Sequence, residues 1–149
     1  WGSDDDYTRG ELTLHGVKSF GEHTLALTLA AGGALSGELP FYDRFVLGGP
    51  LRLSGLFLDQ LNGSRYNLAT LAYYRQYARL PSQIGRGMYI GASLEGGRSN
   101  DPLMKDPWDW IGAGSVFWGA DTILGAVFVG SGYSTLSQGT VYLVIGPRF

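Results

Sequence analysis

The sequence predicts an all-β fold, an antiparallel transmembrane β-barrel or a section of one, as a single domain over residues 1–149. Seven segments alternate apolar with polar residues, as expected of strands with one apolar face. No run of about 18 apolar residues is present, so the chain offers no transmembrane helix. The mean hydropathy of +0.00 fits membrane strands, in which only alternate positions are apolar. The 24 glycines follow no three-residue period, which excludes collagen and favours tight turns and crowded strands.

Charge and composition exclude several classes of protein. With 11 basic and 13 acidic residues the net charge is −2, so nucleic acid is not expected as a partner. The 44% apolar content excludes a largely disordered chain, and the absence of cysteine excludes disulfides and thiolate metal sites. The sequence shows neither an initiator Met nor a signal peptide, so we expect a mature product or a piece of a longer protein.

The first two strands are expected over residues 7–17 and 24–31, joined by a short turn at Gly21 and Glu22. In the second of them, three leucines occupy alternate positions, with Thr and Ala between them. Each strand therefore has one apolar and one polar face. This pattern predicts a hairpin with a lipid-facing side and a lumen-facing side.

The middle of the chain predicts a long loop followed by two strands. Residues 36–63 alternate poorly and contain Pro40 and Pro50, so we expect a loop there. Alternation resumes over residues 66–77, and residues 88–96 have the clearest strand pattern. The residues of that last strand expected to face the lumen are Tyr89, Gly91, Ser93 and Glu95.

Three further strands are expected over residues 110–118, 122–132 and 140–149. Their connections are a polar loop at 98–109, a tight turn at Gly119-Ala120-Asp121 and a loop at 134–139. Connections thus run short, long, moderate, long, short, moderate, as in bacterial barrels with short turns on one side and longer loops on the other. Bacterial barrels have even strand numbers. Seven strands therefore leave two options, an eighth strand at 52–61 or a larger barrel whose other strands precede Trp1.

The last strand stays apolar on one face up to an aromatic terminus, where a free chain end is normally polar and frayed. A terminal Phe on such a strand resembles the assembly signal of the outer-membrane barrels of Gram-negative bacteria. The residues of this signal are Tyr142, Ile145, Gly146 and Phe149. The resemblance implies location in the bacterial outer membrane, with its lipid and the barrel assembly machinery as partners.

The long loop reads LPFYDRFVLGGPLRLSG over residues 39–55. This segment resembles a loop of the BamA-like superfamily of outer-membrane assembly and translocation barrels, the bacterial surface antigen type. In that family an aromatic and Gly-Gly segment leads to an Arg-Gly pair at the tip of a loop that folds back into the barrel. Gly48 and Gly49 match the Gly-Gly, Gly55 matches the glycine of the pair, and Ser54 stands where the family arginine usually does.

The Leu-Ser-Gly version of the motif looks most like the carboxy-terminal barrel of patatin-like phospholipase proteins in the same superfamily. Residues 93–97 and 121–125 and the terminal strand match as well. The resemblance covers residues 7–149 and corresponds to about the last seven strands of a sixteen-stranded barrel. It implies a domain that anchors an attached or partner polypeptide and takes part in its translocation or assembly.

In the family, the loop arginine meets an acidic side chain that projects inward from a strand soon after the loop. Glu95 matches that position by motif and by its inward parity. Because Ser54 supplies no cation, Arg52 is the nearest candidate, and we expect a loop latch between Arg52 and Glu95. A desolvated charge-assisted contact of this kind is worth about 1.5–3 kcal/mol. The alternative is that Arg52 lies in water and Glu95 pairs with Arg75 or another base of the lumen.

No catalytic motif is found in the sequence. A patatin-type hydrolase needs G-x-S-x-G on a strand-to-helix turn, whereas residues 91–95 lack the second glycine and lie on a predicted strand. The chain is therefore not expected to be an enzyme, and any lipase activity would lie in a domain outside it. His15 and His23 are interpreted as ordinary polar positions, and the acidic run at residues 4–6 as a solvated loop end rather than a calcium site. Neither a cofactor nor a metal is expected.

Aromatic residues fall near the predicted strand ends, as in the girdles that barrels place at both membrane interfaces. These residues are Trp1, Trp108, Trp110, Trp118, Tyr7, Tyr66, Tyr77 and Tyr133. The alternative is aromatic core packing in a soluble β-sandwich. A second functional hypothesis is a stand-alone eight-stranded barrel that binds a ligand or acts on lipid. Open strand edges are costly in lipid, so we also expect self-association of two copies or a first half separated from this chain.

Overall fold

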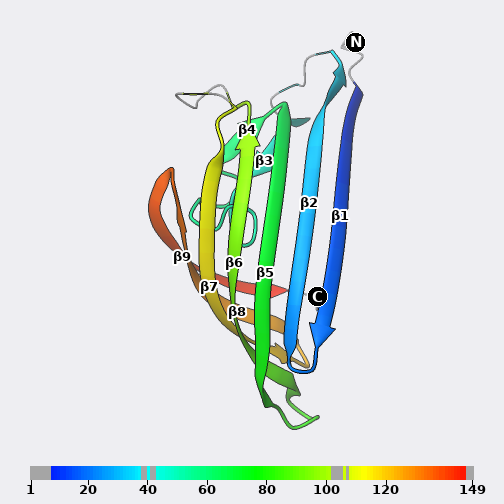
Figure 1. The fold of residues 1–149 in the computed structure, drawn as a ribbon, viewed down its shortest axis with the longest axis vertical. Helices are drawn as coiled ribbons and strands as arrows, with labels where there is room; N and C mark the ends of the chain where they lie inside the picture. The colour runs from blue at the N-terminus through cyan, green and yellow to red at the C-terminus, as the bar shows by residue number, and fades with distance from the viewer. Residues whose placement is uncertain (1–7, 38–39, 41–42, 102–105, 107, 147–149) are drawn as a thin grey trace.

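The computed structural model describes residues 8–37, 40, 43–101, 106 and 108–146. Over these residues the main part of the fold is a seven-stranded antiparallel sheet in the order β1-β2-β5-β6-β7-β8-β9, and the short strands β3 and β4 pair separately. The strands are β1 Thr8–Phe20, β2 His23–Ser36, β3 Phe45–Leu47, β4 Leu61–Gly63, β5 Arg65–Arg79, β6 Gly85–Ser99, β7 Ile111–Thr122, β8 Gly125–Ser134 and β9 Ser137–Gly146. The sheet curls from β1 to β9, and the segment that carries β3 and β4 lies inside the curl (Figure 1). No helix of the described residues has the length and apolar character needed to cross a membrane.

The all-β fold, the antiparallel meander and the inward-folding loop are confirmed, but two predicted connections are wrong. The turn expected at Gly119-Ala120-Asp121 lies within β7, and the actual turn follows Thr122. Gly119 is glycine because the ring of Phe128 covers its Cα, whereas Gly125, at φ +123°, supplies the left-handed conformation near the turn. The loop expected at 134–139 is instead a tight connection, because β8 continues to Ser134 and β9 begins three residues later.

Residues 52–61 do not form an eighth strand. Residues 52–60 fold as successive turns, in which the Leu56 N–H donates to the Leu53 carbonyl (2.9 Å) and the Gln60 N–H donates to the Phe57 carbonyl (3.2 Å), and Leu61 begins β4. Leu53, at φ +72°, has a left-handed conformation that interrupts extended backbone. Among the described residues, the loop contributes to strand pairing only through β3 and β4.

The outer face of the sheet exposes large apolar side chains, whereas the inner face buries several polar ones. On β6, Leu94 is 69% exposed on the outer face, whereas Ser93 and Glu95 on the inner face are 3% and 5% exposed. On β9, Val141 is 80% exposed. The inward orientation predicted for Ser93 and Glu95 is therefore confirmed. Apolar side chains cover the outer face, whereas the inner face carries polar and small residues together with the apolar side chains that pack against the loop.

The hydrophobic core lies between the loop and the inner wall of the sheet rather than between two layers of secondary structure. The loop contributes Phe45, Leu47, Leu53, Leu56 and Leu61, and the sheet contributes Ala30, Tyr66, Leu68 and Ile111. Tyr66, expected in an interfacial girdle, is instead 1% exposed in this core. The loop is therefore packed as tightly as a structural element.

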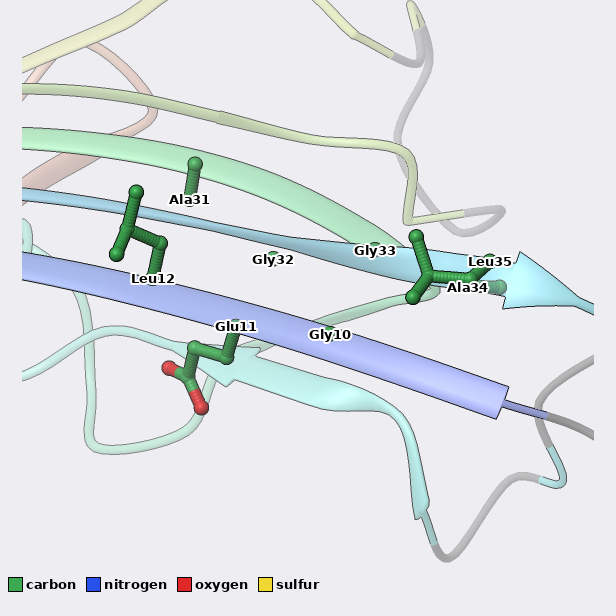
Figure 2. Close-up of a pocket in the computed structure, with 8 residues that line it drawn as sticks. All are labelled: Gly10, Glu11, Leu12, Ala31, Gly32, Gly33, Ala34 and Leu35. Atoms are coloured by element: carbon green, nitrogen blue, oxygen red, sulfur yellow. The ribbon is translucent and has the colours of Figure 1, made fainter.

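Gly32 makes room for two aromatic rings of this core. A Cβ at Gly32 would lie 2.7 Å from the Tyr66 ring and 2.9 Å from the Phe45 ring. The Gly-rich stretch of the β1–β2 hairpin around it forms a shallow depression, in which Glu11 projects from one face of the strands and Leu12 from the other (Figure 2). This depression is thus a thin part of the sheet wall rather than an enclosed cavity.

Candidate functional site: the loop tip inside the curled sheet

The loop turns inward directly after β3. Gly48 and Gly49 have φ of +129° and +100°, a region that side chains other than glycine rarely adopt. A Cβ at Gly48 would also run into the carbonyl oxygen of Phe57, and one at Gly49 would lie 2.8 Å from a Leu58 methyl carbon. The Gly-Gly pair is therefore required where the chain reverses and passes close to its own returning segment.

The tip of the loop is held by the carboxylate of Glu95 on β6. The Ser54 N–H donates to Glu95 Oε2 (2.6 Å), and the Ser54 hydroxyl donates to Glu95 Oε1 (2.5 Å). The Ser93 hydroxyl donates to the same Oε1 (2.5 Å). Ser54 is 0% exposed, so these bonds form away from solvent. Hydrogen bonds to a charged group are worth about 1.5–3 kcal/mol each, and the three donors together stabilise a buried carboxylate.

The hydroxyl protons of this network have one consistent arrangement. The Ser93 hydroxyl donates its only proton to Glu95. Ser115 on β7 must therefore be the donor in its 2.7 Å hydrogen bond with the Ser93 hydroxyl. Tyr142 on β9 then donates to Ser115 (3.1 Å). The chain of donors thus runs from β9 through β7 to the acid on β6, and every hydroxyl in it is satisfied. We call Ser54, Ser93, Glu95, Ser115 and Tyr142 the latch network.

Hydrogen bonds and close packing to its backbone attach the loop tip to β5, β8 and β9. Thr140 on β9 donates to the Ser54 carbonyl (2.6 Å), and Thr70 on β5 donates to the Leu51 carbonyl (2.9 Å). Against β8 the two backbones nearly touch, because a Cβ at Gly55 would overlap the Ser134 amide and one at Gly132 would overlap the Ser54 carbonyl. The glycine of the Ser-Gly pair is therefore required by this close approach.

The expected latch between Arg52 and Glu95 is wrong, although its acidic residue is correct. Arg52 is exposed, and the ion pairs between described residues do not include it. Both oxygens of Glu95 are occupied by serine donors. The alternative partner Arg75 instead forms a 3.2 Å ion pair with Glu22 near the β1–β2 turn. In place of the expected cation, the Ser54 amide and hydroxyl donate hydrogen bonds of 2.6 and 2.5 Å to Glu95.

The base of the loop is clamped by the connection that follows β6. The Asn62 N–H donates to Asp101 Oδ2 (2.7 Å). The Arg65 N–H donates to Asn100 Oδ1 (2.8 Å), and the amide of Asn100 donates to Ser64 Oγ (2.9 Å). The loop is thus fixed both at its tip and where it rejoins the sheet.

The residues of the proposed assembly signal differ in their placement. Tyr142 faces inward in the latch network, whereas Ile145 is 70% exposed on the outer face and Gly146 pairs with Ala126. Phe149 lies outside the described residues, as do Trp1, Tyr7 and the acidic run at 4–6. The placed residues therefore belong to both faces of the strand.

The site has the chemistry of a structural attachment. Its one carboxylate is occupied by donors, and neither histidine reaches it, because His15 contacts Thr28 (2.9 Å) and His23 contacts Tyr73 (2.6 Å). In the described part of the chain there is no cluster of three or more His, Asp or Glu side chains that could hold a metal ion. Comparison of the chain with protein-family models, with curated proteins and with solved structures gives no match in any of the three.

Proposed function

We propose that this chain is a section of a bacterial outer-membrane β-barrel of the BamA-like superfamily. In this proposal it anchors an attached or partner polypeptide and takes part in its translocation or assembly. The observation that carries the proposal is an exposed apolar band on the outer face of the sheet. A soluble sheet would bury such a face, whereas a bilayer requires it.

The band crosses all seven long strands, with one exposed polar residue in it, Ser131 on β8, between Val116 and Val141. Its exposed members are Leu12, Leu14, Leu25, Leu27, Leu29, Leu71, Tyr73, Ile90, Leu94, Val116, Trp118, Val129, Val141, Leu143 and Ile145. Neighbours lie opposite one another in the strand register, as in the pairs Leu27–Leu71 and Leu71–Leu94. Charged outward-facing residues are confined to the strand ends, Lys18 and Arg75 near the turns and Arg65 and Arg98 near the loops.

The height of the band suits a membrane. Trp110, directly before β7, and Trp118 within it lie towards the two ends of the band and are 62% and 43% exposed. At about 3.3 Å per residue they lie roughly 26 Å apart along the strand, or about 20 Å along the membrane normal for a tilt of about 40°. Tyr77 near the turns is also exposed, as expected of an aromatic girdle at that end.

The packed loop supports the assignment to the superfamily. Gly48, Gly49 and Gly55 are each required by backbone geometry, and the loop tip meets an inward acid on a later strand. With the loop filling the curl, this part of the domain acts as a plugged anchor. The arrangement disfavours a stand-alone eight-stranded barrel, because residues 52–60 form turns and Leu61 pairs only with β3, outside the main sheet.

The test is to express the whole coding sequence in a Gram-negative host, fractionate the membranes and compare boiled with unboiled samples by electrophoresis. We expect the protein in the outer-membrane fraction, with faster migration when unboiled, as closed barrels show. Recovery as a detergent-independent soluble protein would refute membrane anchoring. Recovery in the outer membrane without change on boiling would refute the closed barrel.

A further inference from the structure

A cationic cluster on the outer face, near the loop end of the sheet, is not used by the latch network. It consists of Arg65 and Asn67 on β5, Arg98 on β6, and Trp108 and Trp110 in the connection to β7. Asn67 lies directly opposite Arg98 in the register. The alternation along β5 places Arg65 on the same face as Asn67, one step further towards the loop end.

Arg98 is held in a fixed orientation. Its guanidinium lies over the rings of Trp108 (4.5 Å) and Trp110 (5.2 Å). With the Asn67 amide in the orientation that satisfies both its oxygen and its nitrogen, Asn67 Oδ1 accepts two bonds of 3.0 Å from Arg98. These contacts use two of the five N–H groups of a guanidinium, and none of them comes from a described carboxylate.

Neither arginine of this cluster forms an ion pair with a described residue, whereas Arg9, Arg75 and Arg86 each have an acidic partner. The contrast with Arg75 is informative, because it also faces outward but lies at the turn end and contacts Glu22 at 3.2 Å. Two arginines that have no ion-pair partner among the described residues lie beside tryptophans, just beyond an apolar band, and complement an anionic headgroup. Guanidinium groups bind phosphate with paired N–H donors.

We propose that Arg65 and Arg98 bind the phosphate of a lipid headgroup at the loop-end membrane interface, with Asn67, Trp108 and Trp110 orienting Arg98. This site rests on the proposed membrane location. The acyl chains of the lipid would extend along the apolar band, which continues on the same face through Leu71 and Leu94. The site therefore takes a lipid rather than a free anion.

The experiment uses protein extracted from membranes into neutral detergent and titrated with phosphatidic acid or phosphatidylcholine, with bound lipids counted by native mass spectrometry. Wild-type protein should bind phosphatidic acid about tenfold more tightly than phosphatidylcholine. The double variant Arg65→Gln, Arg98→Gln should lose this preference. The matched control Arg75→Gln should keep it, because that arginine lies at the opposite end.

Folding of each variant is first checked by its heat-dependent shift in electrophoretic migration. If the double variant fails to fold, the milder Arg98→Lys replaces it, because lysine keeps the charge but cannot stack on the tryptophan rings. Arg98→Lys should reduce the preference. Equal binding of both lipids by wild type, an unchanged double or Lys variant, or loss of the preference in Arg75→Gln would overturn the site. Displacement of phosphatidic acid by inorganic phosphate would overturn its assignment to a lipid. A protein that never enters membranes would refute the proposed function instead.

Discussion

At the scale of single residues, the tip of the loop is held by the carboxylate of Glu95, which accepts three hydrogen bonds. Replacing Glu95 with Ala would leave the Ser54 amide and two serine hydroxyls buried without their acceptor. Each unsatisfied buried group costs about 1–3 kcal/mol, so we expect Glu95→Ala to lower the free energy of unfolding by about 3–5 kcal/mol. Hydrogen exchange of the amides at 51–56 should accelerate in the same variant.

The matched control for Glu95→Ala is Arg52→Ala. Arg52 is exposed and takes no part in the latch network, so its removal should change the free energy of unfolding by less than about 0.5 kcal/mol. Urea unfolding in detergent and hydrogen exchange give both readings. If Arg52→Ala releases the loop as strongly as Glu95→Ala, the cation rather than the serine holds the tip.

A second residue-scale prediction concerns the contact between the loop tip and β8. Gly132→Ala would place a methyl group into the Ser54 carbonyl, which the backbone can avoid only by moving the loop away. We expect a destabilisation of about 1–3 kcal/mol. Gly16→Ala is the control, because nothing lies within 4 Å of a Cβ at Gly16. Urea unfolding that shows equal effects for the two variants would contradict the close approach.

At the scale of elements, the sequence predicted the seven long strands because side chains in a strand alternate with a period of two. The same parity placed Glu95 inside. It failed in the loop, where the left-handed φ of Leu51 and Leu53 breaks the alternation and turns Ser54 inward while Arg52 stays exposed. The sequence pattern identifies cationic side chains, but it does not identify a backbone N–H donor such as that of Ser54. The inward serines of neighbouring strands were the signal that a hydroxyl network surrounds the acid.

The apolar band provides a prediction at the same scale. Leu94, at 69% exposure, lies opposite Gly114, midway between Trp110 and Trp118, whereas Ile90, at 54% on the same strand, lies opposite Trp118 at one edge of the band. Leu94→Arg should cost about 2–4 kcal/mol in a bilayer, and Ile90→Arg about 0–1 kcal/mol, because the cost of a cation depends on depth. Unfolding titrations in liposomes measure both. Equal, small effects would indicate that this face meets water.

At the scale of the whole molecule, the odd number of strands determines what complements the sheet. All neighbouring pairs in the seven-stranded sheet are antiparallel, so β1 and β9 run in the same direction. Direct pairing of these edges, within one chain or between copies inserted with the same orientation, would therefore be parallel. Antiparallel continuation at both edges requires an odd number of further strands, which also yields the even total of bacterial barrels. This parity favours complementing strands over self-association.

Cysteine crosslinking distinguishes these arrangements, since the chain contains no cysteine of its own. Cysteines are placed at Leu12 or Leu14 on β1 and at Leu143 or Ile145 on β9, singly and in pairs, and the protein is oxidised in the membrane. We expect neither internal nor dimeric disulfides, because other strands separate these edges. The pair Leu71→Cys, Leu94→Cys is the positive control, because these residues lie opposite each other on adjacent strands, within the Cα separation of about 4.4–6.8 Å that a disulfide spans. A disulfide between β1 and β9 would instead establish parallel closure and remove the need for any complementing segment.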